Sequence, residues 1–119
     1  MRSEFGELAR RLLEFAAGVV QLANQLPRTV AGRHVGGQLL RAGTSAGANY
    51  EESCASESRA DFLHKMQIVL KELCESRFWI RLIVRTQLSP EVECATLLQE
   101  TEELCRIFAK SIITAKRKA

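Results

Sequence analysis

The chain has 119 residues, 46% of them apolar, which favours a single domain over residues 1–119 with one hydrophobic core. Its 17 basic and 14 acidic residues give a net charge of +3, which permits a polyanionic partner without requiring one. It has no run of 18 apolar residues and no signal-peptide core near its start, so we expect a cytoplasmic protein without a membrane span. The cysteines, none in a CxxC pair, should then stay reduced and fill small spaces in a core or interface.

Apolar residues recur at helical spacing, while β-branched runs and turn signals are scarce, so the first half of the chain is predicted to be helical. A first helix is expected from Glu4 to Leu26, where Pro27 ends it by restricting the preceding residue and withholding an N–H. A second helix is expected from about residue 30 to Cys54, with Thr29 as its N-cap.

Two glycines four residues apart, Gly43 and Gly47, lie inside the second predicted helix. Each glycine weakens a helix by roughly 1 kcal/mol relative to alanine, so tertiary packing has to stabilise this segment. A helix face of nearly bare backbone suits a very close approach by another helix. We therefore expect such an approach at these two positions.

The third helix is predicted from about Arg59 to Gln87, with Ser58 as its cap, and it is the most apolar segment. A fourth helix follows Ser89-Pro90-Glu91, where serine is the expected cap and proline the first helical residue. Apolar residues on several faces of the third helix place it at the centre of a bundle or in a subunit interface. Because the connections are short, we expect an all-α, up-down-up-down, left-handed four-helix bundle.

Polar side chains occupy positions on the second and third helices where a helical seam normally carries leucine. Steps of three and four residues place them on the face by which one helix packs on another. This set, with the arginine beside it, is called the polar seam: Gln38, Arg41, Ser45, Asn49, Glu52, Lys65, Glu72, Glu75 and Trp79. Buried polar groups are costly unless they bond one another. The pattern therefore favours a buried network of hydrogen bonds and ion pairs that fixes helix register and subunit geometry.

The polar seam also allows an alternative function, a small-molecule or metal-dependent enzyme that uses Glu52, Glu72 and Glu75. Carboxylates on adjacent turns can exchange protons or hold a metal ion. Di-metal bundles combine glutamate with histidine, however, and neither His34 nor His64 falls on the seam. We therefore predict no catalytic residue, no metal site and no cofactor, with the enzyme as the alternative.

Basic side chains form two further candidate sites. The arginine row, Arg77, Arg81 and Arg85, recurs every four residues on one face of the third helix. It could contact phosphates, but the returning fourth helix supplies glutamates, and the pattern favours ion pairs with Glu93, Glu100 or Glu103. The second candidate is the basic tail, Lys116, Arg117 and Lys118, together with Lys110. Repeated around a symmetric ring, these residues would form a positive rim for nucleic acid.

Several motifs together resemble a known bacterial family. They are Leu26-Pro27, Gln38-Leu39-Leu40-Arg41-Ala42, Ser45 through Asn49 to Glu52, Asp61-Phe62 with Lys65, and Lys71-Glu72 with Glu75 and Trp79. The family is that of the four-helix-bundle proteins encoded in intervening sequences of large-subunit ribosomal RNA genes, which are related to the accessory proteins of diversity-generating retroelements. The resemblance implies a ring-like homopentamer with no established enzymatic activity. We expect a non-catalytic scaffold or adaptor whose partner is RNA, DNA or a nucleic-acid-processing protein.

Overall fold

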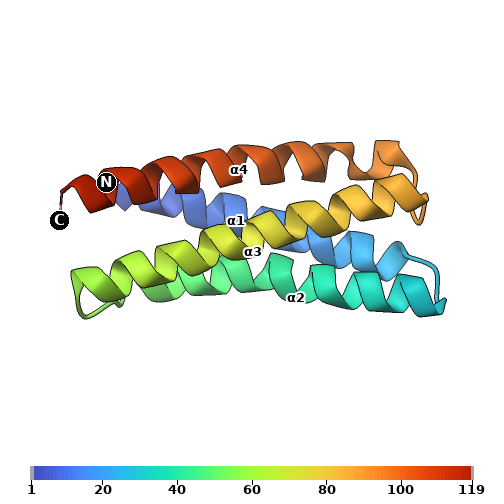
Figure 1. Cartoon of the computed structure of the whole chain (residues 1–119), viewed down its shortest axis with the longest axis horizontal. Coiled ribbons are helices and arrows are strands. Elements are labelled where there is room, and N and C mark those ends of the chain that lie inside the picture. Colours follow the sequence, from blue (N-terminus) through green and yellow to red (C-terminus); the bar gives the residue numbers. More distant parts are fainter. Residues whose placement is uncertain (1, 119) are drawn as a thin grey trace.

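The computed structural model describes the backbone of residues 2–118 and the side chains of residues 5–118. The described chain forms four helices: α1 (Arg2–Gln25), α2 (Val30–Ser53), α3 (Arg59–Thr86) and α4 (Glu91–Arg117). They run alternately up and down, and both chain ends lie at the same end of the molecule (Figure 1). The predicted all-α, up-down-up-down bundle is confirmed, with helix ends that differ from the predicted ones by one or two residues.

The four helices lie at the corners of a square. Each packs against its neighbours in sequence, and α1 meets α4 to close the bundle, although less closely than the other pairs. Within the described chain α1 does not contact α3, and α2 does not contact α4, so these pairs lie on the diagonals. The bundle measures 46 × 21 × 21 Å. The outer surfaces of α1 and α3 therefore point in opposite directions.

An apolar column contributed by all four helices forms the core. Its fully buried members include Leu12, Phe15, Val19, Leu39, Val69, Leu73, Ile80, Ile83, Leu104 and Phe108. Along each helix the buried positions are mostly three or four residues apart, so one face of every helix turns inward. Burying one such side chain contributes about 1.5–3 kcal/mol relative to leaving it exposed.

The predicted central helix is α3, which packs closely against both α2 and α4. Its large apolar side chains are buried or half-buried within its own bundle, and Phe78 is its one exposed large apolar side chain among the described residues. The apolar richness of α3 thus follows from its place between two helices, and Phe78 is the exception. No described helix is long and apolar enough to cross a membrane.

The starts of α2 and α3 are capped as predicted. The hydroxyl of Thr29 accepts a hydrogen bond from the Gly32 backbone N–H at 3.0 Å. The hydroxyl of Ser58 accepts one from the Asp61 N–H, also at 3.0 Å. Each cap satisfies one of the N–H groups that a helix start leaves without an intrahelical partner.

The prediction that Ser89 caps α4 is wrong. The N-cap is Pro90, with φ −62° and ψ 147°, and no side chain bonds the first turn. This extended proline moves the helix start one residue along the chain, and the Ser89 side chain is buried near the Cys94 thiol. At the other end of the same connection Gln87 takes the left-handed conformation, φ 61°, that commonly ends a helix.

The predicted close approach of two helices occurs at Gly43. A Cβ atom at this position would lie 2.8 Å from both methyl carbons of Val19, which is fully buried on α1. One turn later the approach relaxes, because a Cβ at Gly47 would lie 3.6 Å from the Leu12 Cβ, an ordinary contact. Gly43 is thus the position that sets how closely α1 and α2 pack.

Candidate functional site

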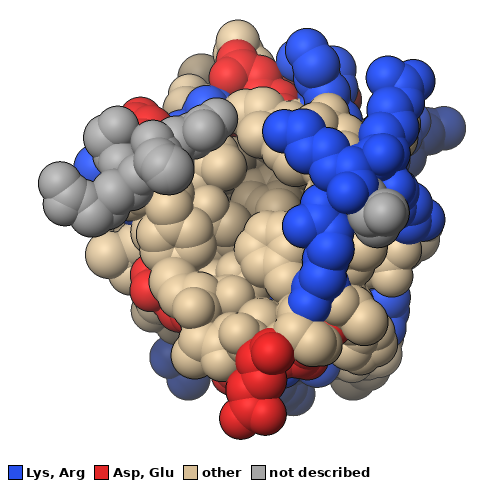
Figure 2. Space-filling view, turned by 90° about the vertical axis from the view of Figure 1, so that its left-hand side faces the viewer, with Lys and Arg blue, Asp and Glu red and all other residues tan. Residues whose placement is uncertain are grey.

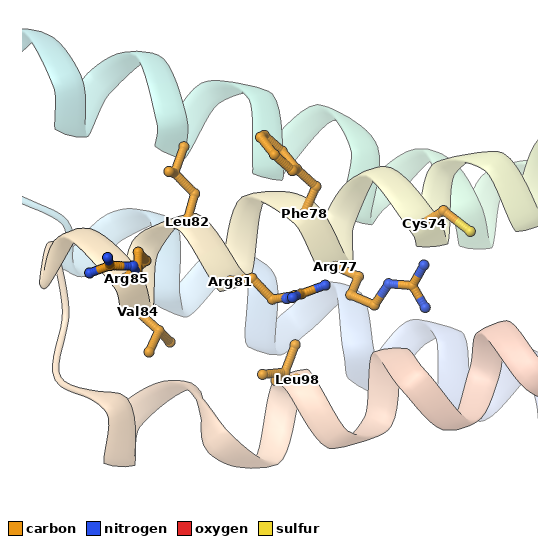
Figure 3. A pocket seen from close by; sticks show the side chains of 8 residues that line it. All are labelled: Cys74, Arg77, Phe78, Arg81, Leu82, Val84, Arg85 and Leu98. Carbon is orange, nitrogen blue, oxygen red and sulfur yellow. The ribbon is translucent and has the colours of Figure 1, made fainter.

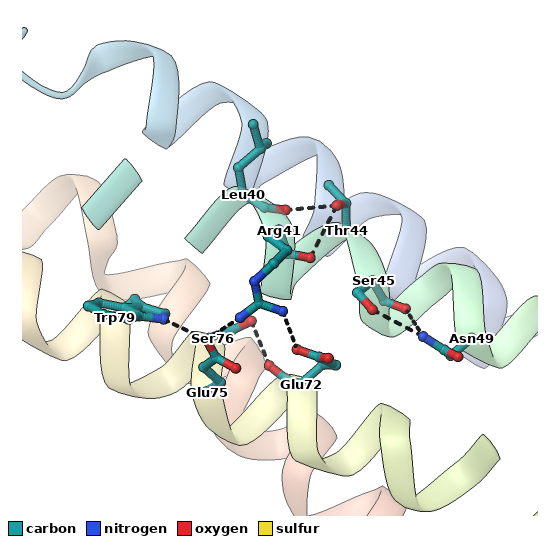
Figure 4. A network of polar contacts seen from close by, with 9 residues as sticks. All are labelled: Leu40, Arg41, Thr44, Ser45, Asn49, Glu72, Glu75, Ser76 and Trp79. Carbon is teal, nitrogen blue, oxygen red and sulfur yellow. Dashed lines mark hydrogen bonds and ion pairs between the residues drawn. The ribbon is translucent and has the colours of Figure 1, made fainter. Parts of the chain in front are cut away.

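The centre of the polar seam is a network that joins α2 to α3. Arg41, on α2, reaches across and bonds the Glu72 carboxylate at 3.2 Å and also the Glu75 carboxylate, both on α3 (Figure 4). Glu75 additionally accepts a hydrogen bond from the Trp79 indole N–H at 3.1 Å. One guanidinium therefore organises two carboxylates, and through Glu75 it also fixes an indole.

The electrostatics of this network follow from the ion pairs. The Arg41 guanidinium, helped by the Trp79 N–H, lowers the pKa of Glu75, and pairing with Glu75 raises the pKa of Arg41. Glu72 is only 7% exposed, whereas the Arg41 side chain is half exposed to solvent. Ion pairs of exposed groups contribute little to stability, so the Arg41–Glu75 pair orients its side chains more than it stabilises the fold, whereas the nearly buried Glu72 carboxylate depends on Arg41 as its partner.

Other members of the polar seam take separate places along the same interface. The Lys65 ammonium bonds Glu52 at 2.7 Å across the α2–α3 connection, and this carboxylate raises the pKa of Lys65. Asn49 donates both of its hydrogen bonds, each 3.0 Å long, to the backbone and hydroxyl oxygens of Ser45 on its own helix. Gln38 is half buried and makes no side-chain hydrogen bond to any described residue.

The structure thus brings together Arg41 with Glu72, Glu75 and Trp79, and Lys65 with Glu52, but it does not join all nine residues. The prediction that the polar seam is buried is wrong for most of its residues. They lie half exposed along the edge of the α2/α3 interface, and Glu72 alone is buried. Steps of three and four residues describe the centre and the edge of an interface equally well. Only the tertiary packing distinguishes the two.

The carboxylates of the alternative enzyme do not form a free cluster. Glu52 is paired with Lys65, and Glu72 and Glu75 share Arg41. No group of three or more histidine, cysteine or acidic side chains that could hold a metal ion occurs among the described residues. A carboxylate held by a cation has its charge already balanced, which weakens it as a metal ligand.

The predicted ion pairs between the arginine row and α4 are wrong. Glu100 and Glu103 of α4 instead bond the Arg11 guanidinium of α1, at 2.8 and 2.9 Å. Both carboxylates lie on the side of α4 that faces α1, whereas the arginine row on α3 borders a groove on another side of α4. Across the described residues, none of the three arginines of the row forms an ion pair with a carboxylate.

The arginine row borders a surface groove between α3 and α4, here called the arginine groove, of ≈ 630 Å³. Its lining consists of Cys74, Arg77, Phe78, Arg81, Leu82, Val84, Arg85 and Leu98. Arg77 and Arg81 lie over the groove, Leu98 reaches into it from α4, and Phe78 and Leu82 project to the other side of α3 (Figure 3). Sequence reasoning missed this groove, although Cys74, Phe78 and Leu82 recur every four residues beside the arginines.

A second basic site lies at the end of the bundle that holds the C-terminus. Arg59, Lys110 and Lys118 line one groove there with Phe62 and other residues, so Arg59 joins the predicted set. Lys116 and Arg117 belong to the last turn of α4. Lys and Arg side chains gather on one side of this end (Figure 2), where they also complement the negative end of the α4 dipole.

The predicted filler role of the cysteines fits two of the four. Cys94 and Cys105 are buried, but Cys54 is exposed just after α2. The Cys74 and Cys105 sulfurs of α3 and α4 lie 4.0 Å apart, and burial, with Cys74 nearby, raises the pKa of Cys105 to about 11. A thiol with a raised pKa is mostly protonated and unreactive at neutral pH.

The protein is therefore a small all-α four-helix bundle whose α2 and α3 are joined by ion pairs of the polar seam. The chain belongs to the 23S rRNA-intervening sequence protein family, which matches residues 7–110. It is also similar to the crystal structure of a protein of unknown function from the S23 ribosomal protein family of Bacteroides thetaiotaomicron. The two chains are 31% identical, with a TM-score of 0.83 over 91% of this chain and 96% of the other. Among curated proteins, none matches the chain.

Proposed function

We propose that the protein is a non-catalytic, homo-oligomeric scaffold that binds nucleic acid, with RNA as the first candidate. The observation that carries the proposal is the arginine row, in which Arg77, Arg81 and Arg85 have no carboxylate partner among the described residues. Arg10, Arg11 and Arg41 are paired, and Arg28, Arg33 and Arg106 are unpaired among the described residues, but the row differs in placing three arginines one turn apart beside a groove. A guanidinium group matches the geometry of phosphate oxygens. An unpaired guanidinium can bind a phosphate without first breaking an ion pair inside the protein.

The family and its relatives support RNA as the partner. The family name refers to the 23S rRNA genes whose intervening sequences encode its members, and the similar structure comes from a family named for a ribosomal protein, which favours RNA. The basic tail with Lys110 and Arg59 adds a second positive surface at one end of the bundle. Binding built from such side chains would be dominated by phosphate contacts and independent of sequence.

Assembly into a ring, a homopentamer by the family resemblance, is the second part of the proposal. Leu13 and Val20 are 68% and 39% exposed on the outer surface of α1, with the exposed Ala17 between them. An apolar stripe of this kind is typical of an interaction site. Contacts between unlike surfaces of identical chains generate rings. A ring would multiply the charges that each chain presents.

The binding test is a titration of labelled RNA and DNA followed by fluorescence anisotropy at several salt concentrations. Each phosphate that the protein neutralises adds about 0.9 to the log–log salt slope on duplex DNA and about 0.7 on single strands. Deleting Lys116–Ala119 should flatten that slope without lowering the stability of the fold, and so should replacing the arginine row by glutamine. Arg33→Gln, which removes an exposed and unpaired cation from α2, is the matched control.

Two results would contradict the proposal. If the protein binds neither RNA nor DNA at about 50 mM salt, where phosphate-driven binding is strong, nucleic acid is not the partner and a protein becomes the better candidate. If light scattering at micromolar concentration returns the 13.3 kDa of a single chain, the scaffold does not assemble.

A further inference from the structure

We propose that the arginine groove selects single-stranded over duplex nucleic acid, with an unpaired base stacked on Phe78 and phosphates bound by the arginine row. This inference rests on the proposed function, because it takes nucleic acid as the ligand and names its form. It assigns Phe78, which is 56% exposed, as a second recognition element beside Arg77, Arg81 and Arg85.

Two parallel rows of side chains on α3 are the basis of the inference. One row is cationic, Arg77, Arg81 and Arg85, and the other is apolar, Cys74, Phe78 and Leu82. Because a helix rises 1.5 Å per residue, neighbours within each row are about 6 Å apart along the axis. A nucleotide chain carries the matching pair of features, since each unit joins one phosphate to one flat, apolar-faced base.

Phe78 is exposed, yet its orientation is fixed. Its ring meets the Trp79 indole edge to face, with centroids 5.0 Å apart and an interplanar angle of 74°. The indole is itself bonded to Glu75, which Arg41 holds from α2. The polar seam therefore orients the aromatic pair at the edge of the groove. A base that stacks there meets a ring already in place, which lowers the ordering cost of binding.

Two other occupants of the groove fit less well. A duplex hides the faces of its bases, so it could use the arginines but not Phe78. A second copy of the chain offers no match to the arginine row, because no described helix carries three exposed carboxylates at four-residue spacing. An acidic helix from another protein would pair with the arginines and is treated as an outcome of the test.

The experiment compares a labelled 12-nucleotide single-stranded RNA with the same strand annealed to its complement. Affinities are measured by anisotropy at about 50 mM salt, and the quenching of Trp79, the one tryptophan of the chain and the ring partner of Phe78, reports on stacking at Phe78. Phe78→Leu keeps an apolar side chain but removes the ring, and Phe78→Tyr keeps a ring without adding a second tryptophan. Val30→Ala, at an exposed site on α2 that has no part in the proposed binding or assembly surfaces, is the control.

We expect the wild-type protein to prefer the single strand. Phe78→Leu should weaken single-strand binding by about 5- to 100-fold, the measured range for losing one stacked base, and leave duplex binding unchanged. Phe78→Tyr and Val30→Ala should bind like the wild type. Because Phe78 is exposed, both of its variants should fold, which circular dichroism verifies.

Each contrary result has a definite meaning. Equal binding of both forms, or an equal effect of Phe78→Leu on both, overturns the inference and leaves the proposed function intact. If neither form binds, the proposed function falls as well. If polyglutamate displaces the RNA as well as unlabelled RNA of equal charge does, the groove recognises acidic charge alone. An acidic protein segment is then the better occupant, and the inference is wrong.

Discussion

Replacing Gly43 by alanine tests whether the approach of α1 to α2 is as close as the structure has it. The new Cβ would lie 2.8 Å from both Val19 methyl carbons and 3.1 Å from the Val19 Cβ. Real Cβ atoms essentially never come closer than 3.0 Å to a neighbour. Because both branches of valine face the glycine, rotating its side chain gives no relief, and the two helices have to move apart.

The magnitude follows from two opposing effects. Overpacking a well-packed core costs about 1–3 kcal/mol, and Val19 is fully buried there. Alanine regains roughly 1 kcal/mol of helix propensity over glycine, so Gly43→Ala should lower the free energy of unfolding by up to about 2 kcal/mol. Gly37→Ala is the control on the same helix, because nothing lies within 4 Å of its Cβ position. It should stabilise by about 0.5–1 kcal/mol.

The assay is guanidinium unfolding of both variants at one fixed chain concentration, since assembly would otherwise shift the midpoint. The sign of the change decides the matter: the midpoint should fall for Gly43→Ala and rise for Gly37→Ala. If both variants are stabilised alike, α1 and α2 are not packed as closely as described, and the reasoning from Val19 is refuted.

Three further predictions concern the ion pairs. Glu72→Gln should lower the free energy of unfolding in urea by about 1.5–3 kcal/mol, since its nearly buried carboxylate loses a charged hydrogen bond to Arg41. Asn49→Ala should lower it by only about 0.5–1.5 kcal/mol, because the Asn49 amide bonds within its own helix. Equal losses for the two variants would contradict this difference. The lowered pKa of Glu75 stabilises the fold above its ordinary value of 4.5, and this stabilisation is lost as pH falls through the lower folded-state pKa. Glu75→Gln should therefore flatten stability against pH below about pH 4.5, and an unchanged acid profile would disprove the coupling. Arg11→Gln should cost about 1 kcal/mol and speed amide exchange in α1, where packing on α4 is thin; unchanged exchange would show that its two pairs do not hold α1.

The bundle and its helix ends could be read from the sequence because the signals that set them are local. Pro27 ends α1, and Thr29 and Ser58 cap the next two helices through bonds that span three residues. The prediction that Ser89 caps α4 was wrong because the position of the helix start depended on the conformation of Pro90 beside it. The polar seam was recognised as a shared interface because helical spacing alone places its residues on one face of each helix.

The pairing of charges was decided by the tertiary structure. The sequence pattern predicted that Glu100 and Glu103 pair with the arginine row, but the rotation of α4 about its axis places both carboxylates against Arg11 on α1. In the same way, helical spacing could not tell the buried Glu72 from the half-exposed Glu75 one turn away. Spacing fixes which residues share a face, whereas the rotation of each helix about its axis, set by packing over the whole core, determines which face meets which neighbour. The unpaired arginines of α3, and the groove beside them, exist because of that rotation.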